Sequence, residues 1–256
     1  MYDLTGLPQD TQDLIASDYA SLFSRKPTTL LSVAADAKTI KGEELGFLTG
    51  ILYLTPAGGS GVNVCPMSAL AQCEAPCLNL AGRGQMTCNQ MSRLRKTLFF
   101  NQYRAEFLAL LRKEVSRVVR KAEREGLTPL VRLNGTSDIR WETVDPALFA
   151  EFPDLQWYDY TKIPNRKNVP ANYDLTFSYS GVPAYRWAVD RAVSAGMRIA
   201  TVFRTRSSIP TEFLGLDVVD GDNSDVRHID PLGVIVALYA KGPAIHDRSG
   251  FVVDAA

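Results

Sequence analysis

The chain has 256 residues and a formal net charge of zero, because 28 lysines and arginines balance 28 aspartates and glutamates. Its 46% hydrophobic and 22% charged residues are typical of a folded protein and exclude a disordered chain. Zero net charge argues against a broad nucleic-acid-binding surface, which needs a concentrated positive field. The sequence has no signal peptide at its start and no run of about 18 apolar residues. We therefore expect a cytoplasmic protein without a membrane partner.

The first 40 residues are a polar, mixed segment that we expect to pack on the core of the protein. Within it, residues 10–23 predict an amphipathic helix that ends at the Lys26-Pro27 step. Residues 45–55 are an apolar, β-branched and aromatic run that stops at Pro56 and a glycine cluster, which predicts the first buried strand. Residues 41–256 are expected to form one α/β domain.

The loop after this strand, residues 56–88, contains every cysteine of the chain: Cys65, Cys73, Cys77 and Cys88. In a reducing compartment crowded thiols are more often ligands than disulfides. Only the pair Cys73/Cys77 has the short spacing of a zinc knuckle. Iron–sulfur clusters accept irregular spacings and are helped by backbone N–H donors in glycine-rich segments such as residues 81–84. The spacing favours an iron–sulfur cluster, 4Fe–4S above others, held by all four cysteines; zinc, disulfides or plain buried thiols are the alternatives.

The rest of the chain alternates between helices and strands. Residues 90–125 predict one long helix ended by Gly126, and its basic residues are balanced by glutamates, so nucleic-acid binding is not expected. Helices are also predicted at 144–152 and 183–195, and strands at 130–133, 155–160, 173–179, 198–203, 216–220 and 233–240. This alternation implies parallel strands joined by right-handed crossovers. We predict a partial, open (β/α)6-type barrel with the cysteine-rich loop after its first strand.

Ligands of parallel α/β sheets bind outside the carboxyl ends of the strands, and polar residues follow the predicted strands here. We expect this rim to bind a polar ligand or cofactor, with Asn134, Thr136 and Asp138 orienting it. Arg83 and Lys162 are candidates to neutralise the negative charge of a cluster. The complete set of predicted rim residues is Asn134, Thr136, Asp138, Asp159, Lys162, Arg204 and Asp222.

Several segments resemble the actinobacteriophage gene product eighty-eight family, an uncharacterised family, over residues 37–245. The similar segments are residues 48–54, 64–66, 73–78, 81–84, 132–142, 159–162, 220–222 and 241–242. The resemblance implies a phage-encoded protein that acts in the cytoplasm of a bacterial host. It also implies that Cys65, Cys73 and Cys77 are the central cysteines.

A second resemblance is architectural. A cysteine loop directly after the first strand of a partial barrel is similar to the layout of radical S-adenosylmethionine enzymes. Residues 134–138 fall where those enzymes have a glycine-rich segment that binds the methionine part of the cofactor. Two features depart from that pattern: the Cys-x3-Cys-x2-Cys motif is absent, and a fourth cysteine would close the iron that must stay open.

Three functions follow from these observations, and the sequence does not decide whether the protein is an enzyme. The first is a phage iron–sulfur protein with a redox or electron-transfer role and a redox or small-molecule partner. The second is a radical-S-adenosylmethionine-like enzyme with an open cluster iron. The third is a zinc-stabilised module that binds a host protein. Cys88 distinguishes the first from the second, because an enzyme of the second kind needs only three cysteine ligands.

Overall fold

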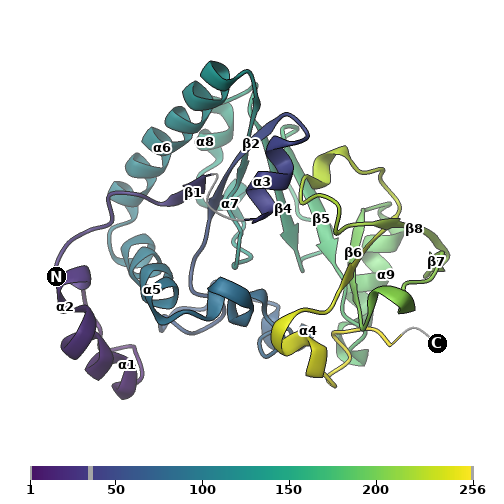
Figure 1. Ribbon diagram of the computed structural model, residues 1–256, viewed down its shortest axis with the longest axis horizontal. Coiled ribbons are helices and arrows are strands. Elements are labelled where there is room, and N and C mark those ends of the chain that lie inside the picture. The colour runs from purple at the N-terminus through teal and green to yellow at the C-terminus, as the bar shows by residue number, and fades with distance from the viewer. Residues whose placement is uncertain (1, 34–36, 255–256) are drawn as a thin grey trace.

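The computed structural model describes residues 2–33 and 37–254, and this part of the chain contains a nine-stranded sheet in the order β1-β2-β3-β4-β5-β6-β9-β8-β7 (Figure 1). The seven strands from β2 to β8 in this order pair in parallel, whereas the edge strands β1 and β7 are antiparallel to their neighbours. The strands are β1 (Leu31–Val33), β2 (Phe47–Leu52), β3 (Thr128–Arg132), β4 (Gln156–Thr161), β5 (Tyr173–Ser178), β6 (Ile199–Phe203), β7 (Glu212–Phe213), β8 (Leu216–Asp220) and β9 (Ile235–Tyr239).

The predicted α/β class is confirmed, and each of the seven predicted strands forms one of the parallel strands. From β2 to β6 the strands lie side by side in chain order, as expected for successive right-handed crossovers. The order then changes, because β9 inserts between β6 and β8. Within the described residues the sheet has two unpaired edges, β1 and β7, and so does not close into a barrel. The two short edge strands carry too few residues for a sequence pattern and were not predicted.

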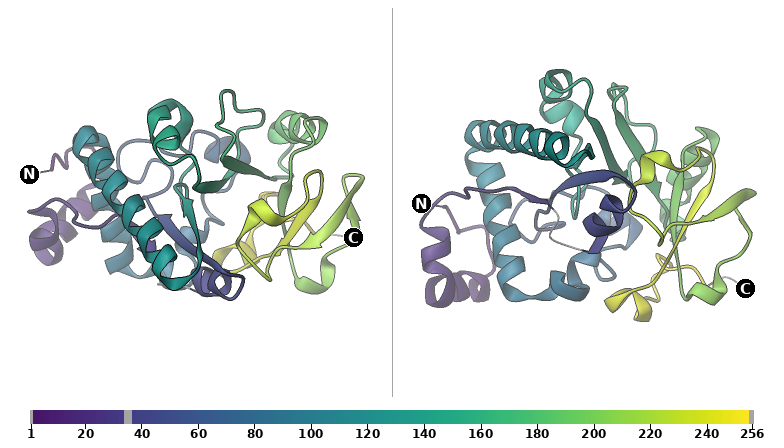
Figure 2. Two further views of the ribbon diagram at one scale, coloured as in Figure 1. Left: turned by 90° about the horizontal axis from the view of Figure 1, so that it is seen from above. Right: turned by 45° about the horizontal axis from the view of Figure 1, so that its top comes forward.

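Helices lie before β2 and in the connections between β2 and β3, β3 and β4, and β5 and β6 (Figures 1 and 2). They are α1 (Gln9–Leu14), α2 (Ala20–Phe23), α3 (Ala37–Glu43), α4 (Ser68–Ala71), α5 (Thr87–Gln102), α6 (Arg104–Glu125), α7 (Trp141–Val144), α8 (Pro146–Glu151) and α9 (Arg186–Ser194). A π-helical turn, Ile15–Tyr19, joins α1 to α2, so the predicted helix at 10–23 forms in three contiguous pieces. The predicted helix at 144–152 begins at Pro146 instead, because the backbone of Asp145 leaves the helical region between α7 and α8.

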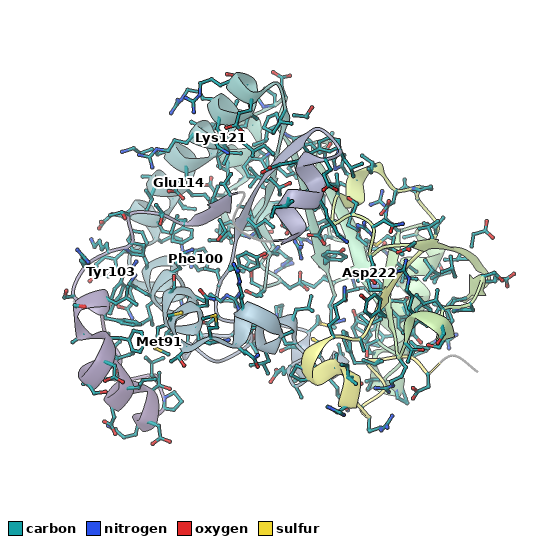
Figure 3. The ribbon with its side chains drawn as sticks, in the orientation of Figure 1. Met91, Phe100, Tyr103, Glu114, Lys121 and Asp222 are labelled. Atoms are coloured by element: carbon teal, nitrogen blue, oxygen red, sulfur yellow. The ribbon has the colours of Figure 1, made fainter. Side chains whose placement is uncertain are left out.

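The prediction of one continuous helix over residues 90–125 is wrong. The helix breaks at Tyr103, whose φ of −134° and ψ of 52° separate α5 from α6. The break folds the aromatic residues of the two helices together: the rings of Phe100 and Phe107 lie 5.2 Å apart, and that of Tyr103 lies 5.8 Å from Tyr2 (Figure 3). No proline or glycine lies at this position in the sequence. The break is set by tertiary packing. At its other end α6 stops at Gly126, as predicted, with a φ of 68°.

Alternate residues of the strands face opposite sides of the sheet. On the helix-covered face, Val131 and Trp157 join a core cluster with Val115 and Val118 of α6. Tyr2 of the N-terminal segment belongs to the same cluster. The buried Glu114 of α6 accepts the backbone N–H groups of residues 30 and 31 at 2.6 and 2.8 Å, and this fixes the start of β1 to α6 (Figure 3). The opposite face of the strands, the cavity face, is more polar.

Candidate functional site

A cavity of about 360 Å³ lies at the carboxyl ends of the parallel strands. Its volume is at the lower end of small-molecule sites, which span about 300–1,000 Å³. Its walls come from the cysteine loop with α4, the loop after β3, the ends of β4, β5, β6 and β9, the loop after β8, and the 3-10 turn Gly242–His246. Figure 1 shows α4 beside the C-terminal part of the chain, although the two are far apart in the sequence.

Three of the four cysteines, Cys65, Cys73 and Cys77, line this cavity and are partly buried. Burial raises the pKa of each thiol, that of Cys65 to about 12. The thiols also influence one another, since ionisation of Cys77 would raise the pKa of both Cys65 and Cys73. The backbone N–H of Asn79 donates to the Sγ of Cys77 at 3.4 Å. Burial therefore favours the protonated form of these thiols, and a cation bound next to the sulfur atoms would favour the thiolate form.

Cys88 is in a different environment. It lies at the start of α5, its side chain is exposed, and it does not line the cavity in the described part of the chain. All four thiols are free, so none forms the disulfides that the spacing alone left open. The structure thus separates one cysteine from the other three.

The donor set can be compared with the metals that the sequence suggested. Among the described residues, no three His, Cys, Asp or Glu side chains are placed to hold a single metal ion. A structural zinc needs four ligands in a tight tetrahedron, and the three cavity thiols do not form part of one. The described residues thus provide no single-ion site of the kind that a structural zinc requires.

Lys162 places a positive charge at the thiol end of the cavity. Its ammonium group donates to the backbone oxygens of Ser178 and Tyr179 at 3.1 and 3.2 Å and to the Ser178 hydroxyl at 3.0 Å. Burial lowers the pKa of Lys162, while the nearby Cys73 and Asp138 act to raise it. In return, the ammonium lowers the pKa of Cys73 and Cys77. Arg93 lowers the pKa of Cys77 as well, and more strongly than Lys162 does, so Lys162 is the main cation for Cys73 alone.

The loop after β3 lines the cavity with Asn134, Thr136 and Asp138, but their polar groups also tie the loop together. The Oδ1 of Asn134 accepts from the Ser137 hydroxyl and the Ile139 N–H, both at 2.9 Å. Thr136 donates its hydroxyl to a backbone oxygen of the segment after β2. Asp138 accepts from the Thr161 hydroxyl and the Lys162 N–H at 2.8 Å. These three residues shape the wall and leave little hydrogen-bonding capacity for a ligand.

Asp222 and Lys162 line the cavity as well, whereas the predicted rim residues Asp159 and Arg204 do not in the described structure. Asp159 shares the parity of Trp157 on β4 and faces the helix-covered side, where it accepts the Tyr173 hydroxyl at 2.8 Å. Burial raises the pKa of Asp159 to about 7. Arg204 pairs with Asp254 at 2.7 Å, on the surface beyond β6. The alternation of residues along β4 would have predicted that Asp159 points away from the cavity, like Trp157.

Five further residues with polar side chains line the cavity: Lys41, Arg132, Tyr160, Asp225 and Lys241. Four of them, all except Lys41, lie at or just after the ends of predicted strands, so the strand-end rule finds them, although the sequence assigns them no individual role in ligand binding. Lys41 belongs to α3, which comes before the first parallel strand, and no sequence signal places it at this site.

The described residues contain no helix that is long and apolar enough to cross a membrane. In comparisons with known proteins, no curated protein and no solved structure matches the chain. A family model described as gene product 88 matches residues 23–255, nearly the whole length. This match confirms the family resemblance that the sequence motifs suggested. The chain belongs to the gene product 88 family of phage proteins.

Proposed function

We propose that this protein binds a cubane-type 4Fe–4S cluster through Cys65, Cys73 and Cys77 and has a redox function. The observation that carries the proposal is that these three thiols line one cavity, whereas Cys88 is exposed outside it. Three ligands leave one iron without a cysteine, and the cavity gives a small molecule access to it. We therefore favour an enzyme with an open iron over a closed, four-cysteine electron carrier.

The residues around the thiols support this assignment. Buried thiols with raised pKa values ionise when they bind a metal, because the metal supplies the missing positive charge. The Asn79 N–H on the Cys77 sulfur is the kind of donor that stabilises cluster thiolates. Lys162 offsets the net negative charge of a thiolate-bound cluster. When bound, such a cluster supplies one-electron transfer, and its open iron can take the amino and carboxyl groups of S-adenosylmethionine.

The strand order gives further support by analogy. The cysteine loop follows β2, the first parallel strand, and β2 to β6 lie in chain order. These five strands follow the order of a partial (β/α)6 barrel of the radical S-adenosylmethionine type, whereas β9 takes the place next to β6 that the sixth strand of such a barrel would have. Because one fold hosts many functions, the analogy adds to the argument from the thiols and does not replace it.

The test is anaerobic purification followed by iron, sulfide and zinc analysis and absorbance spectroscopy. We expect a brown protein with an absorbance band at about 400 nm and about four irons per chain. Cys65→Ala, Cys73→Ala and Cys77→Ala should each lose the cluster, while the matched control Cys88→Ala should keep it. A colourless protein with stoichiometric zinc would overturn the proposal and favour a zinc-stabilised module that binds a host protein.

A second measurement separates an open iron from a closed carrier. Electron paramagnetic resonance of the reduced protein is recorded with and without S-adenosylmethionine. If one iron is open, the cofactor should change the spectrum of the wild type and of Cys88→Ala alike. A spectrum that the cofactor leaves unaltered, together with loss of the cluster in Cys88→Ala, would show four-cysteine ligation and rule out the open iron.

A further inference from the structure

The cavity has a second end that the cluster proposal does not use. Arg132 and Tyr160 lie two residues before Asn134 and Lys162 on the same face of β3 and β4, which places them about 7 Å deeper along the strands. Further charged residues come from α3 and from the loops after β8 and β9. We call this set the ionic end of the cavity: Lys41, Arg132, Tyr160, Asp222, Asp225 and Lys241.

The carboxylates of the ionic end are already used by the protein. One oxygen of Asp222 pairs with the Lys241 ammonium, and the other accepts the Tyr239 N–H at 3.2 Å. One oxygen of Asp225 pairs with Arg132 at 2.7 Å, and the other lies 3.5 Å from the Tyr160 hydroxyl. A ligand would therefore find little acceptor capacity here.

The cations of the ionic end have donors to spare. The exposed Lys41 donates one N–H, to the backbone oxygen of Asp222 at 2.6 Å, and pairs with no carboxylate among the described residues. An ammonium group has three N–H donors. The Nε of Arg132 is not counted among these donors, because it is buried and ion-paired with the Oδ1 of Asp159 at 3.7 Å. Donors exceed acceptors, which is the condition for binding an anion.

We propose that the ionic end binds the anionic group, a carboxylate or a phosphate, of a small organic substrate. Lys41 and Lys241 hold the anion, and the apolar part of the substrate lies against the wall of Ala200, Val202, Leu238 and Phe251. The negative charge of a cluster at the thiol end would direct an anion to the same place. The anion site rests on side chains other than the cysteines, so it stands or falls independently of the cluster.

The test is isothermal titration calorimetry of the full chain with inorganic phosphate and, separately, with succinate. Wild type should bind at least one of them, and the preferred probe identifies phosphate or carboxylate as the ligand group. Lys41→Met should weaken binding about tenfold, because it removes a charge-assisted hydrogen bond. The control Lys121→Met removes the same charge from the exposed end of α6, distant from Asp222, and should bind like wild type (Figure 3).

Two results would overturn the anion site. The first is that the wild type binds neither probe. The second is that Lys41→Met and Lys121→Met bind with equal affinity, which would show that Lys41 makes no specific contact with the anion. Unchanged melting temperatures of both variants show that the exposed substitutions leave the fold intact. Iron is measured in the same samples. Anion binding in a protein without iron would overturn the cluster proposal and support the anion site. A protein that contains the iron but binds neither probe would support the cluster and overturn the anion site.

Discussion

The two faces of the same parallel strands differ in what they bury. On β3, Val131 faces the helices and belongs to the core cluster, while its neighbour Arg132 faces the cavity. On β4, Trp157 packs against Phe149 on the helix-covered face, whereas Tyr160 lines the cavity. Alternation along a strand thus separates residues that stabilise the fold from residues that are available to a ligand.

The two faces also differ in energetic terms. Apolar and aromatic residues on the helix-covered face gain free energy when they leave water. The cavity face buries the charges of Arg132, Asp138 and Lys162, whose desolvation is costly unless each charge has a partner. A fold that buried only apolar groups there would be easier to stabilise, so the charges are expected to serve binding or catalysis.

The largest effect on stability is expected from the helix-covered face. Phe107 is fully buried on α6, between the rings of Phe99, Phe100 and Trp141. Phe107→Ala should lower the free energy of unfolding by about 3–5 kcal/mol, because it removes apolar contacts and leaves a cavity. Urea unfolding measures the loss. The milder Phe107→Leu should lose less than about 1.5 kcal/mol, and equal losses in the two variants would contradict a packing role.

On the cavity face, Arg132→Met should cost about 3 kcal/mol, because it leaves Asp225 and Asp159 without their buried cation. Arg132 lowers the pKa of Asp159, so its removal raises that pKa further above the unfolded value. A group with a raised pKa in the folded state stabilises most at low pH. The loss in Arg132→Met should therefore be smaller near pH 5 than near pH 8.

The partner of Arg132 can be identified with a double-mutant cycle. If the ion pair with Asp225 dominates, Arg132→Met combined with Asp225→Asn should lose less stability than the sum of the two single changes. Strict additivity would show that Asp225 is not the relevant partner and would shift the effect to Asp159.

The sequence predicted much of the sheet and less of the site. Apolar runs bounded by glycine and proline located the seven parallel strands, because fully buried strands leave that pattern. The break at Tyr103 and the insertion of β9 between β6 and β8 left no local signal. Both are set by contacts between residues far apart in the chain, such as the ring of Tyr103 against that of Tyr2.

The site shows the same division. Crowding of the cysteines indicated a special loop, and the strand ends indicated where ligands bind. The spacing did not show that Cys88 lies apart, because only the fold of the loop decides which thiols reach the cavity. Lys41 was not identified because it lies on α3, before the first parallel strand, whereas the strand-end rule covers residues that follow strands.

A smaller effect is expected from Lys162→Met. The substitution removes the ammonium that donates to Ser178 and Tyr179, which should cost about 1–3 kcal/mol in urea unfolding. It also removes the charge that lowers the pKa of Cys73 and Cys77, so these thiols should ionise at higher pH than in wild type. Ultraviolet thiolate absorbance against pH, in the protein without metal, measures the shift. A variant that titrates like Lys121→Met would place the ammonium too far from the thiols to act on them.

The smallest effect on stability is expected at Cys88, which lies outside both faces. Cys88→Ala should change the free energy of unfolding by less than about 0.5 kcal/mol, because the side chain is exposed. The exposed thiol of Cys88 should be the first to react with limiting iodoacetamide, and peptide mass spectrometry identifies the modified cysteine. Cys65, Cys73 and Cys77 should react slowly, since burial raises their pKa and restricts access. If one of these three reacted before Cys88, that thiol would lie outside the protected cavity, and the set of three ligands would lose a member.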